Sequence, residues 1–506
     1  MRASFFTFLP LFASATALRV GLHGKPSPAS RLQRRASIAG TTNVDDSSNI
    51  EYTTNITLGG NSFEVIIDTG SSDLYVTGDV PGAIDTGKTA DVQYAIGEIN
   101  GSIKTATLEF AGYTVQNQVY IDAPVSNTSA VGTGLIGLGP NSGSVIFSKI
   151  KNSSGDTPLD NIFRSNTSTP NFITILLQRD DDPGAVFPGE LTVGEVLPGF
   201  ENITKQPQLP VSQVAVNDAG NQHWQTLTDA NGVIGPDGKA IDFKTGVKST
   251  SNKAQLTAVF DSGFTFPQVP KAISDAIYEN APGAKFVKDS GLGAVWTLDC
   301  EVEINIAFVF GGIKFPVHPL DTVIDLNATD DDGSHICVGA FQPISTATSP
   351  DFDMVLGMGF LRNVYLFINF GDFVEGKLNQ TADPYLQMLS TTNDTTAVHN
   401  DFVKVRGASK SVNNNPSFLD RVKSHKTVVI AICVNAGLLI IGAIVFCCLR
   451  NRKIRRSPAG FMNLQSSYQP LNEPAPAAYN MGPVGPPDGP PPPQHGTYNN
   501  PWDSHY

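Results

Sequence analysis

The feature that most constrains this chain is a short pattern that occurs twice. Residues 65–71 read VIIDTGS, and residues 258–264 read AVFDSGF. Each copy is an apolar run that ends in Asp and continues with a small hydroxyl residue and a Gly. An apolar element containing Gly follows each copy, at residues 134–138 and 355–358. The same order of elements in both halves predicts two similar lobes.

The two acids of this repeat, Asp68 and Asp261, define the candidate chemistry. A carboxylate at the end of an apolar strand is costly to bury alone. Two carboxyl groups about 3 Å apart cannot both ionise, so they share a proton. One member can then take a proton from water while the other protonates a carbonyl oxygen, which hydrolyses an amide without a metal or a covalent intermediate. Gly70 and Gly263 permit the tight turn and close backbone approach that such a pair needs.

Over roughly residues 51–387 the sequence resembles the pepsin family of aspartic endopeptidases. Residues 68–72 are similar to the first active-site motif of that family, and residues 261–263 to the second. Residues 94–97 lie where the family has its flap, a hairpin that closes over the substrate. The resemblance implies an all-β, bilobal fold with pseudo-twofold lobes and a central cleft, which binds protein or peptide substrates in extended conformation.

The site residues follow from the same motifs, with no metal and no cofactor expected. The catalytic residues are Asp68 and Asp261. The expected supporting and substrate-binding residues are Thr69, Gly70, Ser71, Tyr94, Ser262 and Gly263. Two positions depart from the family: Ala95 replaces the usual flap Gly, and Phe264 stands where relatives have Ser or Thr. Because Phe264 offers no hydroxyl to the second acid, we expect an altered pKa for Asp261.

Other interpretations of these residues remain open. An isolated Asp-Gly pair is usually an ordinary turn, and Tyr94 could be a plain strand aromatic. Phe264 also supports a catalytically silent, aspartic-protease-like receptor or adhesion protein. Residues 132–137 fit the dinucleotide pattern GxGxxG, but no strand-loop-helix unit surrounds them. The eight His lack the HExxH spacing, and there is no GxSxG, so metallo- and serine hydrolases have no support.

Both ends of the chain carry targeting features. Residues 1–17 predict a secretory signal peptide. Residues 18–35, which end in two Arg, predict a short propeptide. Residues 427–449 are uncharged and long enough to span a bilayer, and the basic cluster that follows predicts a cytosolic C-terminus. The Pro-rich residues 450–506 predict a disordered cytosolic tail that can recruit partners.

The remaining boundaries follow from the changes in composition. Short alternating runs separated by turn residues predict strands in an N-terminal lobe, 50–200, and a C-terminal lobe, 201–390. The best helical spacing covers residues 270–280. The polar residues 391–426 predict a stalk between the lobes and the membrane. The expected product is a monomer with a single membrane helix.

Cysteine use, glycosylation acceptors and charge indicate the compartment. Three of the five Cys lie in the predicted membrane span, which leaves Cys300 and Cys337 as a disulfide pair in an oxidising compartment. Nine Asn-X-Ser/Thr triplets all precede the span, as expected for a lumenal or extracellular ectodomain. We expect a type I membrane protein of the cell surface, vacuole or endosome. The net charge of −13 argues against nucleic-acid binding.

Overall fold

The structure is a computed structural model of the whole chain. All of the residues that it describes belong to one compact unit. They are residues 18–26, 50–94, 98–126, 129–165, 169–179, 189–215, 220–290, 292–329, 333–344, 349–371, 374 and 382–412.

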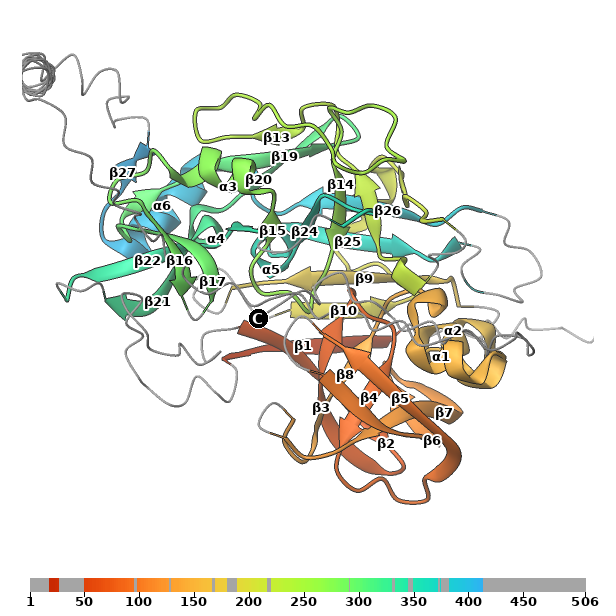
Figure 1. Cartoon of the computed structure of the whole chain (residues 1–506). Helices are drawn as coiled ribbons and strands as arrows, with labels where there is room; N and C mark the ends of the chain where they lie inside the picture. The colour runs from red at the N-terminus through yellow and green to blue at the C-terminus, as the bar shows by residue number, and fades with distance from the viewer. Residues whose placement is uncertain are drawn as a thin grey trace, which may run out of the picture. The chain divides into compact units, whose positions relative to one another are not determined.

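The N-terminal half contributes seven strands to one end of a 13-stranded sheet, drawn in red and orange in Figure 1. Phe63, Val65 and Ile67 alternate along the third strand and are buried, as expected for a strand with one face in the core. Gly59 and Gly60 turn the chain with φ of 59° and 89°, which glycine adopts without strain. The seven strands are β2 (Ile50–Leu58), β3 (Asn61–Asp68), β4 (Leu74–Thr77), β5 (Ile84–Gln93), β6 (Glu98–Phe110), β7 (Tyr113–Ala123) and β8 (Thr133–Gly137).

The other end of this sheet joins the two halves of the chain. Its strands are β9 (Phe172–Leu177), β10 (Gly189–Val193), β11 (Leu209–Pro210), β25 (Val364–Asn369) and β26 (Tyr385–Ser390). β9 pairs with β10 on one side and with β25 on the other, so that strands 190 residues apart in sequence lie side by side.

One further strand, β1 (Leu18–Pro26), links the two ends of the large sheet. Its first five residues pair with β10, and its last four pair with β2. The strand lies within residues 18–35, the predicted propeptide. Residues 27–49, which contain the two Arg, lie outside the described part of the chain.

The described residues of the C-terminal half form four smaller sheets. The five-stranded sheet contains β12 (Gln225–Leu227), β14 (Thr257–Phe260), β24 (Met354–Leu356), β15 (Gln268–Val269) and β23 (Gln342–Pro343). The three-stranded sheet contains β13 (Val233–Ile234), β19 (Ile306–Phe310) and β20 (Ile313–Val317). The four-stranded sheet contains β16 (Lys285–Ser290), β17 (Gly293–Leu298), β22 (His335–Gly339) and β21 (Val323–Thr329). The two-stranded sheet contains β18 (Val302–Glu303) and β27 (Lys410–Ser411).

Helices are short and lie between strands. They are α1 (Val145–Ile150), α2 (Pro158–Ser165), α3 (Lys271–Tyr278), α4 (Pro319–Thr322), α5 (Met358–Leu361) and α6 (Thr395–Arg406), with 3-10 turns at Asn141–Gly143, Ser153–Gly155 and Glu201–Lys205. α3 confirms the helix expected within residues 270–280. The described part of the chain is mostly β, which confirms the predicted class.

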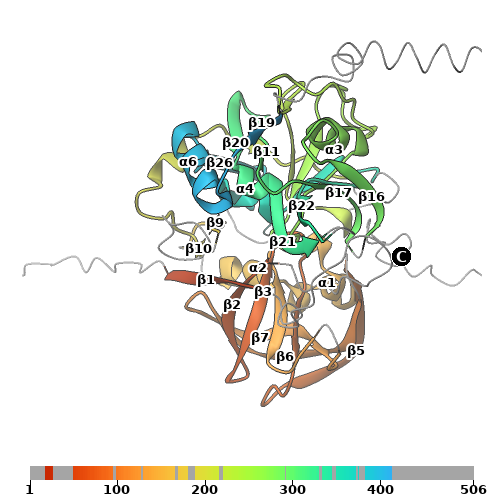
Figure 2. The ribbon, with the colours of Figure 1, turned by 90° about the vertical axis from the view of Figure 1, so that its left-hand side faces the viewer.

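The predicted stalk, 391–426, is wrong for the residues up to Val412. α6 and β27 lie in this range, and Figure 2 shows α6 beside α4. Phe402 of α6 is completely buried, and Arg406 donates to the carboxylate of Asp325 at 3.1 Å. The helix escaped the sequence analysis because charged and polar side chains, rather than an apolar stripe, make most of its contacts.

Several predictions for the chain ends concern residues that the structure does not describe. The signal peptide (1–17), the membrane span (427–449) and the tail (450–506) all lie outside the described residues. Within the described residues, no helix has the length and apolarity needed to cross a bilayer.

Candidate active site

Asp68 is the last residue of β3, and the neighbouring strand β8 fixes its backbone. The two strands are parallel, with Asp68 opposite Gly137. The N–H of Leu138 donates to the Asp68 carbonyl at 2.7 Å. A Cβ on Gly137 would lie 2.5 Å from the carbonyl carbon of Ser72, so only glycine allows the chain after Asp68 to pass this close.

Asp261 follows β14 and has an equivalent neighbour in β24. These strands are also parallel, and the N–H of Asp261 donates to the Leu356 carbonyl at 3.2 Å. Gly357 follows β24 as Gly137 closes β8, and a Cβ on Gly357 would overlap the Phe264 carbonyl. The repeat seen in the sequence therefore folds into the same local arrangement twice.

The residues that follow the two acids bind each other across the halves. The N–H of Thr69 donates to the Ser262 hydroxyl at 3.1 Å, and the N–H of Ser262 donates to the Thr69 hydroxyl at 2.9 Å. Both hydroxyls also donate onward, to the carbonyls of Phe260 and Ile67 respectively, each at 2.9 Å. Both side chains are completely buried, so this network of hydrogen bonds holds the two acids in fixed relative positions.

This hydrogen-bond network brings the carboxyl groups of Asp68 and Asp261 into hydrogen-bond contact. The N–H of Gly70 donates to Asp68 Oδ1 at 2.8 Å, and the N–H of Gly263 donates to Asp261 Oδ1 at the same distance. A Cβ on Gly263 would lie 2.6 Å from Asp68 Oδ1, and one on Gly70 would overlap the Asp261 carboxyl. Glycine is required at both positions because each backbone passes against the opposite acid.

The environments of the two acids differ. Burial raises the pKa of Asp68, while the Ser71 hydroxyl, which donates to Oδ2 at 2.5 Å, acts in the opposite direction. Burial raises the pKa of Asp261 well above its usual range, and the adjacent charge of Asp68 raises it further. Phe264, the counterpart of Ser71, has no hydroxyl to oppose this. Both pKa values are raised, that of Asp261 the more strongly, so these environments favour the shared proton on Asp261.

Tyr94 lies at the tip of the hairpin formed by β5 and β6. Its ring packs against Tyr75 of β4, with 5.9 Å between the ring centroids. Residues 95–97, including the Ala95 that departs from the family, lie outside the described residues. The hairpin predicted from the flap motif is present, and the role of Tyr94 over a substrate stays a prediction.

Three residues that support the site had no signal in the sequence. Asp73, which is 3% exposed, caps α1 by accepting hydrogen bonds from Ser144, Val145 and Ile146. Trp224 crosses between the halves, with its indole N–H donating to the Leu138 carbonyl at 2.9 Å. His223 contacts Gly70. Each is distant in sequence from its partner, so no local pattern could identify it.

The predicted disulfide between Cys300 and Cys337 is formed, with 4.9 Å between the Cα atoms. Cys300 also lies near Asp325 and His335, a grouping of side chains that could otherwise hold a metal ion. Because the Cys300 sulfur is bonded to Cys337, it is not available as a thiolate ligand.

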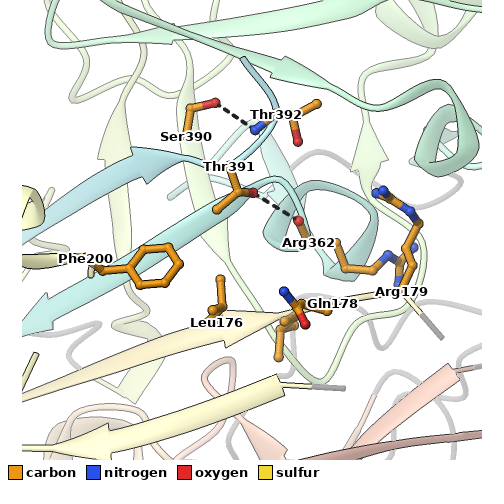
Figure 3. A pocket seen from close by; sticks show the side chains of 9 residues that line it. Leu176, Gln178, Arg179, Phe200, Arg362, Ser390, Thr391 and Thr392 are labelled. Atoms are coloured by element: carbon orange, nitrogen blue, oxygen red, sulfur yellow. Dashed lines mark hydrogen bonds between the residues drawn. The ribbon is translucent and has the colours of Figure 1, made fainter. Parts of the chain in front are cut away.

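A cavity of about 270 Å³ lies elsewhere, between the ends of β9 and β26 (Figure 3). Two of its lining residues are engaged in ion pairs within the fold. The guanidinium groups of Arg179 and Arg362 donate to the two carboxylate oxygens of Asp321, at 2.7 and 2.6 Å. Thr391 donates to the Arg362 carbonyl at 3.4 Å. The cavity shares no lining residue with the Asp68–Asp261 pair, and the ion pair between Arg179 and Asp321 joins the two halves of the chain.

Comparisons with known proteins agree with this geometry. The sequence model for "Eukaryotic aspartyl protease" matches residues 80–374, a range that includes Asp261 and begins after Asp68. "Major aspartyl peptidase 1" of Cryptococcus neoformans is 24% identical over 70% of this chain and 74% of its own length. A "Probable aspartic-type endopeptidase CTSD" of Arthroderma otae is 26% identical over 58% and 69%. "Aspartic protease 1" of Caenorhabditis elegans is 26% identical over 62% and 79%.

The family match covers more than half of the chain, and the site has the paired acids on which such chemistry depends. The chain therefore belongs to the eukaryotic aspartyl protease family and is an aspartic-type endopeptidase.

Proposed function

We propose that Asp68 and Asp261 together hydrolyse peptide bonds. The observation that carries this proposal is the buried hydrogen-bond contact between the two carboxyl groups, of which Asp261 has the more strongly raised pKa. Asp68 takes a proton from a water held between the carboxyl groups, and the resulting hydroxide adds to the peptide carbonyl carbon. Asp261 protonates the carbonyl oxygen. The C–N bond of the tetrahedral intermediate then breaks as the proton held by Asp68 passes to the amine and a hydroxyl proton of the intermediate returns to Asp261, which restores both acids.

The supporting residues have roles that follow from their contacts. Thr69 and Ser262 hold the two acids together, and Gly70 and Gly263 leave room for them. Ser71 stabilises the ionised form of Asp68. Tyr94, at the tip of its hairpin, closes over an extended peptide that lies between the two lobes.

The enzyme works at acidic pH under this proposal. Turnover needs an ionised Asp68 and a protonated Asp261. Activity therefore falls at low pH as Asp68 becomes protonated, and it falls at high pH as Asp261 ionises. Because the pKa of Asp261 lies well above its usual range, the active window extends above the ordinary range for aspartate.

The proposed setting is a lumenal or extracellular ectodomain on a single membrane helix at residues 427–449. The predicted signal peptide and the basic cluster after residue 449 support this orientation. The acceptor Asn residues whose side chains the structure describes are all exposed, at Asn55, Asn100, Asn152, Asn202 and Asn393. The destination is the cell surface, the vacuole or an endosome, and the working form is a monomer.

A soluble ectodomain and a quenched hydrophobic peptide provide the test. Asp68→Asn and Asp261→Asn should each abolish cleavage without unfolding the protein, whereas the exposed Asp79→Asn should leave it unchanged. Pepstatin should inhibit the wild type. Full cleavage by either active-site variant, after contaminating proteases are excluded, contradicts the assignment of the pair.

The same assay tests the alternative that the sequence left open at Phe264, a catalytically silent peptide receptor. Phe264 deprives Asp261 of the hydroxyl that Ser71 gives to Asp68. This candidate predicts saturable peptide binding with no turnover at any acidic pH. The same peptide, followed by fluorescence polarisation and by cleavage, separates the two functions.

A further inference from the structure

A buried histidine, His223, contacts the loop that follows Asp68. It immediately precedes Trp224 and β12 in the C-terminal half, yet its ring reaches a loop of the N-terminal half. The residue is 8% exposed. The mechanism proposed above gives it no role, and nothing in the repeated motif points to it.

Among the described residues the ring of His223 makes one hydrogen bond, which fixes the nitrogen that carries the proton. Nδ1 lies 3.0 Å from the carbonyl oxygen of Gly70. A carbonyl only accepts hydrogen bonds, so Nδ1 carries the hydrogen and donates it. In the neutral ring Nε2 is then unprotonated. Nε2 is buried and has no hydrogen-bond partner among the described residues, so it is the position at which the ring can gain a proton.

The ring is held firmly in this position. The side chain of Gln222 donates to the His223 carbonyl at 2.8 Å, and Trp224 is anchored by its bond to Leu138. The ring meets Phe352 edge to face, with 5.9 Å between the centroids and 87° between the planes. The hydrogen bonds of Gln222 and Trp224 hold the backbone on either side of His223, and the contact with Phe352 holds its ring beside Gly70.

The peptide group between Gly70 and Ser71 connects His223 to Asp68. Its carbonyl accepts from His223, and its N–H, which belongs to Ser71, is one of the smaller influences that lower the pKa of Asp68. A hydrogen bond to an amide oxygen polarises the amide and makes its N–H a stronger donor. The donation is stronger still when the donor is a cation, as in a protonated imidazole. The chain of contacts therefore runs from His223 through one peptide group to the proposed base.

We propose that His223 is a positioning residue that acts through this peptide group to favour the ionised form of Asp68 and thereby extends peptide hydrolysis to lower pH. The inference rests on the proposed function of Asp68 and Asp261. The printed contacts of the ring are with Gly70 and Phe352, not with either carboxyl group, so its effect reaches Asp68 through the peptide group.

The charge state of His223 changes within the acidic range. Burial lowers its pKa to about 4, and the bond to Gly70 opposes this effect. No charged side chain in the described part of the chain contributes to the shift. The carboxylate of Asp353, close to Phe352 in sequence, accepts instead from Thr245 and from two N–H groups. The acids on the elements packed around the ring are Asp68, Asp261, Asp351 and Asp353.

Two substitutions separate the donor from the charge. His223→Asn keeps an N–H donor near the position of Nδ1 and cannot be protonated, whereas His223→Phe keeps only the planar shape. The measurement is kcat/KM of the ectodomain against pH, with the peptide used above. His335→Asn, which changes an exposed histidine on β22, is the matched control.

We expect both His223 variants to remain active at the top of the pH profile. Their acidic limb should move to higher pH by about half a unit, which is roughly a threefold loss of kcat/KM at a fixed pH on that limb. The alkaline limb, set by Asp261, should not move. The shift in the Phe variant should equal or exceed that in the Asn variant, and the control should follow the wild type.

An acidic limb that coincides with the wild type in the Asn variant overturns the inference, even if the Phe variant fails to fold. This result leaves the proposed function intact provided that Asp68→Asn and Asp261→Asn remain inactive. Conversely, activity in those two variants removes the proposed base, whatever the His223 variants do. The two failures are therefore distinguishable.

Discussion

At the scale of single residues, one hydroxyl separates the two acids of the site. Ser71 donates to Asp68, and Phe264 stands at the equivalent place beside Asp261 without a donor. Hydrogen bonds to a carboxylate stabilise its charged form. This difference favours the proton on Asp261, and we expect Ser71 and Phe264 to influence opposite limbs of the pH profile.

We expect Ser71→Ala to raise the pKa of Asp68, because the ionised carboxylate loses its side-chain donor. The acidic limb of kcat/KM should move to higher pH by about one unit, with little change in the alkaline limb.

Phe264→Ser should affect the alkaline limb instead and move it to lower pH, because Asp261 gains a donor. A pH profile for each variant tests this, and movement of the same limb in both would contradict the assignment.

The raised pKa of Asp261 also predicts how stability depends on pH. Between the ordinary pKa of aspartate and the raised value, the folded state binds more protons than the unfolded state. The free energy of unfolding therefore falls as the pH rises through this window, by up to about 1.4 kcal/mol per unit. Asp261→Asn removes this titration. We expect the variant to be more stable than the wild type at neutral pH, with a smaller difference at low pH.

Urea unfolding at several pH values checks this expectation. The Asp79→Asn variant serves as a control, because its side chain is exposed. Equal free energies of unfolding for the wild type and Asp261→Asn at neutral pH would show that the ionised Asp261 does not destabilise the folded state.

The sequence was sufficient for residues whose role depends on their neighbours in the chain. Each Asp, the hydroxyl residue and the Gly after it form one local motif, so the chemistry could be predicted before the geometry was known. His223 and Asp73 act on partners 153 and 71 residues away. Such contacts depend on how the halves fold together, and no short pattern encodes them.

At the scale of secondary-structure elements, α6 shows the limit of hydrophobic periodicity. Phe402 is its completely buried residue, while Asp401 lies 3.2 Å from His318 and Arg406 binds Asp325. A helix attached mainly by ion pairs has no apolar stripe, so its sequence resembles a solvated linker. Strands, by contrast, alternate apolar and polar residues and were recognised.

We expect Phe402→Ala to destabilise the folded ectodomain by about 3 to 5 kcal/mol, since it leaves a cavity in place of a buried ring. Val405→Ala on the same helix should cost less than about 1 kcal/mol, because Val405 is 39% exposed. Denaturant unfolding of both variants measures the difference. Equal, small effects would indicate that α6 is not part of the cooperative fold.

At the scale of the whole molecule, the proposed tether predicts where the protein is found. The full chain should stay with membranes through washes at high salt and alkaline pH. A chain that ends at residue 426 should be secreted, and it should keep its activity because α6 and β27 are retained. Fractionation and a peptide assay test both parts. Recovery of the full chain in the soluble fraction would argue against a span at residues 427–449.

The strand β1 has a consequence for processing of the chain. It precedes Arg34 and Arg35, while nine backbone partners on β10 and β2 hold it in the large sheet. A cut after Arg35 would separate β1 covalently from the rest of the chain but leave its pairing with β10 and β2 in place. The product would then migrate as two fragments in denaturing gels and as one particle in native chromatography. Departure of the short fragment would bare the edges of two strands to solvent.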